Sequence, residues 1–74
     1  MFEEEYKYIG AKIIYYRKLQ RLTQEELSQK AAISTSYLSR IERGAYNKGV
    51  PISTLLRIAD ALKVNVAKFF DKDV

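Results

Sequence analysis

Two short helical patterns lie so close together along this chain that only a tight turn can join them. The first opens with TQEEL, in which Thr23 lies three residues before Glu26. A threonine and a glutamate at this spacing form a capping box, in which each side chain binds the other residue's backbone N–H. A helix is therefore predicted to begin at Gln24 and to end near Lys30.

The second pattern lies in ISTSYLSRIERG, residues 33–44. Ser34 is the predicted N-cap, because its hydroxyl can accept a hydrogen bond from a backbone N–H of the first turn. Leu38 and Ile41 would share the buried face, and Gly44 is placed to end the helix in a left-handed conformation. With a turn at about 31–33, the two helices describe a helix-turn-helix, although the spacing alone would also suit the helical hairpin of any small helical protein.

Three further helical patterns, and no convincing strand, lie along the chain. One runs from about Tyr6 to Gln20, one from Ile52 to Leu62, and a short one follows Asn65, its predicted cap. The predicted inward-facing residues of the first four helices are Ile9, Ile13 and Tyr16, then Leu27 and Ala31, then Leu38 and Ile41, and then Leu55, either Leu56 or Ile58, Ala59 and Leu62. The short fifth helix carries Val66, Phe69 and Phe70. The fold class is therefore all-α.

Composition excludes several kinds of chemistry. The 74 residues suffice for one domain, residues 1–74, and they include no cysteine and no histidine. Disulfides, thiolate or histidine metal sites and the commonest general base are thus ruled out. Without a glycine-rich phosphate loop or carboxylates clustered in a cleft, the sequence predicts no enzyme, no metal, no cofactor and no small-molecule ligand. No apolar run approaches the roughly 18 residues of a membrane span, so a cytoplasmic protein that contacts no membrane is expected.

Basic residues are concentrated in the middle of the chain. The net charge is +4, yet twelve Lys and Arg residues lie between Lys7 and Lys68, against four Asp and Glu residues. A basic body with acidic ends suits a polyanionic partner such as nucleic acid. Charge alone would equally suit ordinary solvation.

Three segments in register resemble a known family. IGAKIIYYRKLQRLTQEELSQKAAIS, TSYLSRIERG and LLRIADALKVNVAKFF are together similar to the Cro/lambda-repressor-like (Xre-type) helix-turn-helix family, over about residues 9–70. The resemblance implies a compact five-helix DNA-binding domain with its helix-turn-helix at about 24–43 and its third helix in the DNA major groove. The implied function is regulation of transcription, by a repressor or a related regulator, through sequence-specific binding of double-stranded operator DNA.

The resemblance also implies which residues read base edges. The matching positions are Thr35, Ser36 and Arg40, with Ser39 close by. An arginine fork fits the O6 and N7 acceptors of guanine, and hydroxyls can donate or accept. Short hydroxyl side chains favour helix less than Lys or Glu would, which agrees with a helix that approaches DNA closely. Base reading is not the only explanation for these residues. Thr35 and Ser36 could be hydroxyl residues of the kind common in the first turn of any helix, and Arg40 could be an ordinary surface arginine.

A second set of residues matches positions that contact the DNA backbone. Gln24 lies at a helix N-terminus, where free N–H groups favour a phosphate. The Tyr37 hydroxyl is expected to reach a phosphate oxygen, and Arg43, Asn47 and Lys48 are expected to touch the backbone on the other side. Each could instead be ordinary solvated surface.

Arg17 and Glu42 match a structural ion pair that ties the first helix to the end of the third. Breaking such a pair from one side costs about 3–5 kcal/mol when it is partly buried. Two departures from the family pattern concern turns. Arg21 and Ala32 stand where glycine is usual, so either they adopt left-handed angles, at about 1 kcal/mol each, or the turns differ locally.

Family members commonly bind as symmetric dimers on half-sites about one helical turn apart. The end of the chain, KVNVAKFF, carries more apolar surface than a short helix buries. Val66, Phe69 and Phe70 are therefore candidates for a two-fold homodimer interface with part of the 52–62 helix, although one phenylalanine could instead complete the core.

The alternative function is a protein-interaction module with secondary DNA binding. It could be antitoxin-like, or it could be the N-terminal domain of a longer regulator. A segment dedicated to the partner protein would distinguish this alternative, and only four residues follow Phe70.

Overall fold

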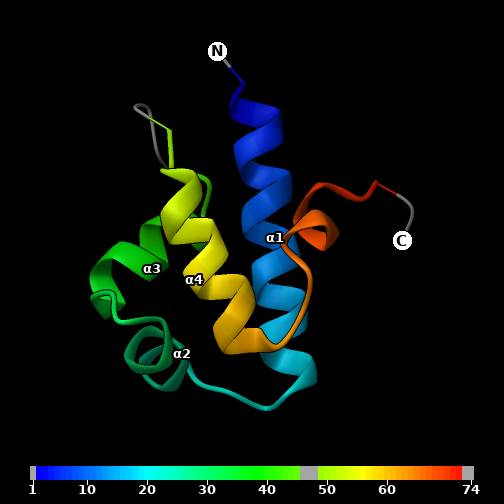
Figure 1. Ribbon diagram of the computed structural model, residues 1–74. Helices are drawn as coiled ribbons and strands as arrows, with labels where there is room; N and C mark the ends of the chain where they lie inside the picture. Colours follow the sequence, from blue (N-terminus) through cyan, green and yellow to red (C-terminus); the bar gives the residue numbers. More distant parts are fainter. Residues whose placement is uncertain (1, 46–48, 73–74) are drawn as a thin grey trace.

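The computed structural model describes residues 2–45 and 49–72 of the chain. Within them lie four α-helices, α1 (Glu3–Leu19), α2 (Gln24–Ala31), α3 (Thr35–Glu42) and α4 (Ile52–Leu62), followed by a 3₁₀ helix, η1 (Val66–Phe70) (Figure 1). The predicted all-α fold is confirmed. The fifth helix is a 3₁₀ helix and not an α-helix.

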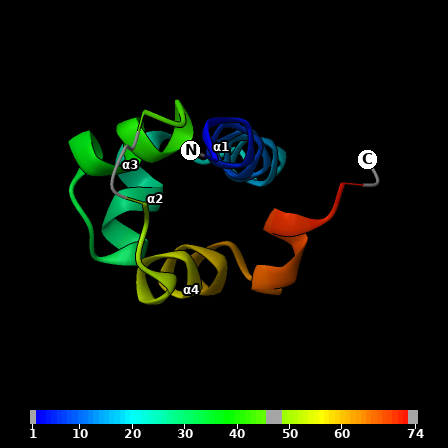
Figure 2. The ribbon, with the colours of Figure 1, turned by 90° about the horizontal axis from the view of Figure 1, so that it is seen from above.

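The helices enclose one apolar core. In a view down the axis of α1, helices α2 and α3 lie on one side of it and η1 lies on the other (Figure 2). Helix α4 crosses beneath them. α4 packs against α2 and η1, while α1 packs against α3 and η1. Ile58 is fully buried whereas Leu56 is 49% exposed, so Ile58 is the inward residue of the two. The buried apolar residues are Ile9, Ile13, Leu27, Ala31, Leu38, Ile41, Leu55, Ile58, Ala59, Leu62 and Phe69.

Side chains cap the starts of three helices. Thr23 Oγ1 accepts the backbone N–H of Glu26 at 3.0 Å, and the Glu26 carboxylate accepts the backbone N–H of Thr23 at 2.8 Å, which completes the predicted capping box. Ser34 caps α3 and Asn65 caps η1, also as predicted. α1 begins at Glu3, before the predicted Tyr6, because the acidic residues of its first turn favour a helix N-terminus.

All four α-helices end in the same kind of turn. Arg21, Ala32, Gly44 and Lys63 each have φ between 58° and 69°. In each turn the left-handed residue and the one after it donate backbone hydrogen bonds to carbonyls of the last helical turn, which is the Schellman motif. Arg21 and Ala32 thus adopt the left-handed angles considered from the sequence, and Lys63 does so as well.

An apolar residue anchors three of these turns. Leu22, Ile33 and Val64 directly follow the three left-handed residues that are not glycine, and all three pack against the core. Full burial of such a side chain would contribute roughly 1.5–3 kcal/mol, so partial burial offsets much of the cost of about 1–2 kcal/mol for left-handed angles. The turns are therefore held without glycine.

The capping box predicts a dependence of stability on pH. The backbone N–H and the hydroxyl of Thr23 hold the pKa of Glu26 below its ordinary value of 4.5. Because the pKa is lowered, the carboxylate stabilises the fold above pH 4.5. This contribution is lost as the pH falls through the pKa that Glu26 has in the folded protein. The Glu26→Gln protein should therefore lose less stability than wild type between pH 5 and 3, as measured by urea unfolding. Glu25→Gln, which removes a carboxylate from the same turn but not from the box, is the control and should retain the wild-type decline.

Candidate nucleic-acid interface

Helix α3 divides its residues between a buried and an exposed side. Leu38 and Ile41 are in the core. Ser36, Arg40 and Arg43 are exposed, and they lie along one side of the helix because they follow one another at i, i+4 and i+7. We call these three residues the outer stripe. It presents two guanidinium groups and one hydroxyl to solvent.

Thr35 and Ser39 lie beside the outer stripe and are half-buried. Thr35 Oγ1 lies 2.9 Å from Oγ of Ser28 in α2. Ser28 Oγ in turn donates to the backbone carbonyl of Glu25 at 2.9 Å. This chain of hydrogen bonds ties the first turn of α3 to α2 and so fixes the start of α3 relative to the preceding helix.

Two of the predicted backbone-contacting residues lie in α3 and directly after it. Tyr37 is half-buried and packs against the core. Arg43 follows the last residue of α3 and is exposed. Asn47 and Lys48 lie outside the described residues.

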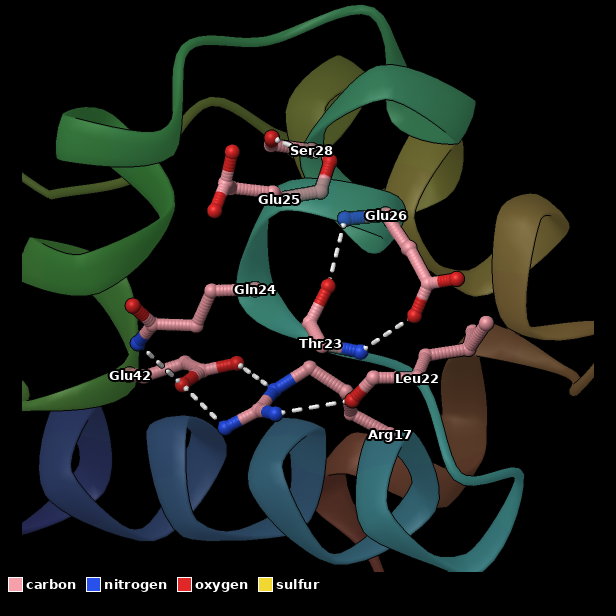
Figure 3. Close-up of polar contacts among 8 residues, drawn as sticks. All are labelled: Arg17, Leu22, Thr23, Gln24, Glu25, Glu26, Ser28 and Glu42. Atoms are coloured by element: carbon pink, nitrogen blue, oxygen red, sulfur yellow. Dashed lines mark hydrogen bonds and ion pairs between the residues drawn. The ribbon is translucent and has the colours of Figure 1, made fainter.

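Arg17 and Glu42 form the ion pair that the resemblance implied. Arg17 Nε lies 2.7 Å from Glu42 Oε2, and Arg17 Nη2 lies 3.1 Å from Oε1, so the guanidinium binds the carboxylate with two hydrogen bonds (Figure 3). The Glu42 side chain is only 2% exposed. Arg17 Nη1 also donates to the backbone carbonyl of Leu22 at 2.9 Å. The pair thus joins α1, the α1–α2 turn and the end of α3.

Gln24 extends this network to the start of α2. Its Nε2 donates to Glu42 Oε1 at 2.8 Å (Figure 3). Because a carboxylate only accepts hydrogen bonds, the amide nitrogen and not the oxygen must face Glu42. The second N–H of that amide is left for another acceptor. The negative charge of Glu42 is compensated by Arg17, so it does not oppose an anion near α3.

Comparison with known proteins identifies the chain. The helix-turn-helix family matches residues 13–69. The chain belongs to this family. Its members are transcription regulators and not enzymes. The immunity repressor protein of Bacillus phage phi105 is 44% identical over 59 residues, which cover 80% of this chain and 40% of that protein. The chain thus spans less than half the length of this relative.

Solved structures of family members have the same fold. The restriction-modification controller protein C.AhdI from Aeromonas hydrophila is 27% identical, with a TM-score of 0.85 over 90% of this chain and 98% of that chain. SinR, a Bacillus subtilis protein described as the master regulator for biofilm formation, has been solved in complex with DNA. In that complex it is 36% identical, with a TM-score of 0.79 over 85% of this chain and 98% of that chain.

The helix-turn-helix domain depends on two glycines. A Cβ on Gly10 would lie 2.5 Å from the backbone oxygens of both Ile41 and Glu42, so only glycine lets α1 approach the end of α3 this closely. A Cβ on Gly44 would lie 2.7 Å from the Cα of Lys7. Sequence analysis did not select Gly10, although a glycine inside a helical pattern often indicates close packing. It also missed Ser28, a mid-helix serine that can bond to the backbone of its own helix.

The structure corrects one predicted interface residue. Phe69 is fully buried and its ring centroid lies 6.5 Å from that of Tyr16, so it completes the core and is not available to a second subunit. The 3₁₀ helix turns this side chain toward α1. Val66 is half-buried against the core, and Phe70 is 50% exposed.

A surface hollow of about 340 Å³ lies between α1 and the end of the chain. Its lining includes Tyr8, whose hydroxyl donates to the carbonyl of Asp71, and Lys12, whose Nζ lies 5.6 Å from the Tyr8 ring centroid. None of the residues that line it belongs to α2 or α3. The hollow is therefore separate from the helix-turn-helix.

Residues 2–45 and 49–72 contain neither a cluster of metal-ligating side chains nor a membrane-spanning helix. No group of three or more His, Cys, Asp or Glu side chains there could hold a metal ion. No helix in this part of the chain is both long enough and apolar enough to span a bilayer.

Proposed function

We propose that this chain regulates transcription by binding double-stranded operator DNA sequence-specifically, with α3 in the major groove. The outer stripe of Ser36, Arg40 and Arg43 carries this proposal, because it presents base-reading and phosphate-binding groups along the exposed side of one helix. The DNA complex of SinR and the repressor function of the phage relative support it. Because its ligand is the cell's DNA, we assign the protein to the cytoplasm.

Base reading is assigned to the first turn and the middle of α3. Ser36 and Arg40 are exposed, while Thr35 and Ser39 are half-buried beside them. An α-helix fits the major groove, and its N-terminal residues then approach the base edges. The guanidinium of Arg40 is long enough to reach a guanine with both of its parallel N–H groups.

Backbone binding is assigned to residues on either side of α3. The free N–H of the Gln24 amide would donate to a phosphate at the start of α2, where the helix dipole also favours an anion. Glu42 would position that amide. Tyr37, Arg43, Asn47 and Lys48 would contact phosphates further along the groove.

Replacement of Arg40 tests base reading. Arg40→Ala should lower the discrimination at one base pair per half-site by about 1–3 kcal/mol, because the guanine loses a bidentate partner. Affinities for a set of operators with single base changes provide the measurement.

Arg43→Ala is the matched control, since it removes another exposed arginine from the same stripe. It should weaken binding to all sequences alike and reduce the salt slope of log K by about one unit. If Arg40→Ala behaves in the same way as Arg43→Ala, Arg40 is a phosphate ligand and not a base reader.

We also propose that two copies bind a two-fold symmetric operator. Phe70 is 50% exposed, and Ile52 and Leu56, one turn apart on α4, are 59% and 49% exposed. A contiguous patch of exposed apolar side chains marks an interface, and the proposed contact requires these three side chains to share one surface. We assign Phe70, Val66 and this side of α4 to the contact between the copies.

Sedimentation of the wild-type and Phe70→Ser proteins tests the dimer. At tens of micromolar the wild type should contain dimer and Phe70→Ser should be mainly monomer, because serine removes the apolar contact without altering the core. A wild type that stays monomeric with and without operator DNA would contradict the proposed dimer. Leu19→Ser is the control, since Leu19 is 64% exposed at the end of α1 and outside the assigned interface. It should dimerise as the wild type does.

A further inference from the structure

Buried Ser28 and half-buried Thr35 form a pair of hydroxyls whose donor and acceptor follow from a third partner, the backbone of Glu25. The two oxygens lie 2.9 Å apart, so one hydroxyl donates to the other. Ser28 Oγ also lies 2.9 Å from the backbone carbonyl oxygen of Glu25 (Figure 3). A carbonyl oxygen has no hydrogen to give, so Ser28 is the donor in that bond.

A serine hydroxyl carries a single hydrogen. Since Ser28 gives its hydrogen to Glu25, it must accept from Thr35. Ser28 is only 2% exposed, so its own hydroxyl has no water partner to replace Glu25 or Thr35. The hydrogen of the Thr35 hydroxyl is therefore committed to the interior, and only lone pairs remain on the side that faces away from α2.

We infer that Thr35 reads DNA as a hydrogen-bond acceptor only. This inference rests on the proposed function, since it concerns the polarity of one group in the proposed interface. An acceptor cannot bind a phosphate oxygen, the O6 or N7 of guanine, or the O4 of thymine, which are all acceptors themselves. In the major groove it can bind only the amino groups of adenine N6 and cytosine N4.

Ser28 is thus a specificity-determining residue that never touches DNA. It fixes the hydrogen of Thr35 and so removes the choice between donor and acceptor that a threonine hydroxyl otherwise has. We expect adenine or cytosine, not guanine or thymine, on the strand nearest Thr35 at one position of each half-site.

Three variants test this assignment after the wild-type operator has been selected from random duplexes. Thr35→Val keeps the shape of the side chain and removes the acceptor, so the position at which its base preference vanishes is the one that Thr35 reads. Ser28→Ala releases the Thr35 hydrogen, so guanine and thymine should bind better at that position alone. The preference there should fall roughly three- to tenfold, the value of one hydrogen bond. In the Ser28→Ala/Thr35→Val double variant the base profile should equal that of Thr35→Val.

An operator analogue tests the same point with the wild-type protein. If the preferred base is adenine, its replacement by unsubstituted purine, which lacks the 6-amino group, should weaken binding roughly three- to tenfold. If the preferred base is cytosine, an analogue without the 4-amino group is used instead. A preference for guanine or thymine at this position, an unchanged profile in Ser28→Ala, or no loss with the analogue would each overturn the inference while leaving sequence-specific binding intact. If the wild type selects no motif at all, both the inference and the proposed function fail.

Discussion

Glu42→Ala should lower the free energy of unfolding by about 3–5 kcal/mol, because it leaves the charge of Arg17 buried without its partner. The Arg17 side chain is 11% exposed and that of Glu42 is 2% exposed, so little water reaches the pair to replace the lost hydrogen bonds. The same change also removes the acceptor of the Gln24 amide. A domain of this size gains only about 0.05–0.15 kcal/mol of stability per residue, so a loss of this size removes a large part of its free energy of unfolding. Urea unfolding, followed by circular dichroism, measures the loss.

Two variants show whether the loss comes from the pair. Glu25→Ala removes an exposed carboxylate from α2 and should cost no more than about 1 kcal/mol, as expected for a charge near a helix end. The double variant Arg17→Met/Glu42→Leu should be more stable than Glu42→Ala, since neither charge then remains unpaired. An unchanged melting temperature in Glu42→Ala would refute the structural role of the pair.

Gly10→Ala should destabilise the domain, although helix propensity predicts the opposite. Alanine favours a helix interior over glycine by about 1 kcal/mol. The added Cβ, however, would lie 2.5 Å from two carbonyl oxygens of α3 and 2.8 Å from the carbonyl carbon of Glu42. These are backbone atoms, so no rotation of a side chain relieves the contact and α1 must move away from α3. Overpacking of this kind costs about 1–3 kcal/mol, and occasionally more, so after the gain of about 1 kcal/mol in helix propensity we expect a net loss of up to about 2 kcal/mol.

The neighbouring residue provides the control for Gly10. Ala11→Gly changes an exposed position of the same turn, so it should cost only the propensity difference of about 1 kcal/mol. Thermal melts of both variants are sufficient, because the sign for Gly10→Ala decides between packing and propensity. A gain in stability for Gly10→Ala would show that α1 does not approach α3 as closely as described.

Local signals predicted the helix starts well. Thr23 with Glu26, and Ser34 before its helix, act within four residues, so the sequence alone determines them. The predicted ends of α1, α2 and α4 lie within one residue of the observed ends, but the left-handed turn at Lys63 was not predicted. Lys63 adopts left-handed angles because Val64 packs into the core behind it, and such an anchor depends on tertiary packing.

Contacts distant in sequence account for what the sequence could not decide. Phe69 and Phe70 are adjacent and identical, and only the turn of η1 against α1 places one in the core and the other in solvent. Gly10 is required by a helix end more than thirty residues away. The hydrogen bond between Ser28 and Thr35 likewise depends on how α2 and α3 pack. The ion pair of Arg17 and Glu42 could be predicted only through the resemblance to the family.

Selection of bound sequences from a random duplex library, at low and at near-physiological salt, tests the central claim most directly. We expect a two-fold symmetric motif that persists at the higher salt, with guanine at the position in each half that loses discrimination in Arg40→Ala. Direct base contacts maintain specificity when counterion release no longer dominates binding. Binding without any motif, which vanishes as the salt rises, would contradict the account and leave only a basic surface.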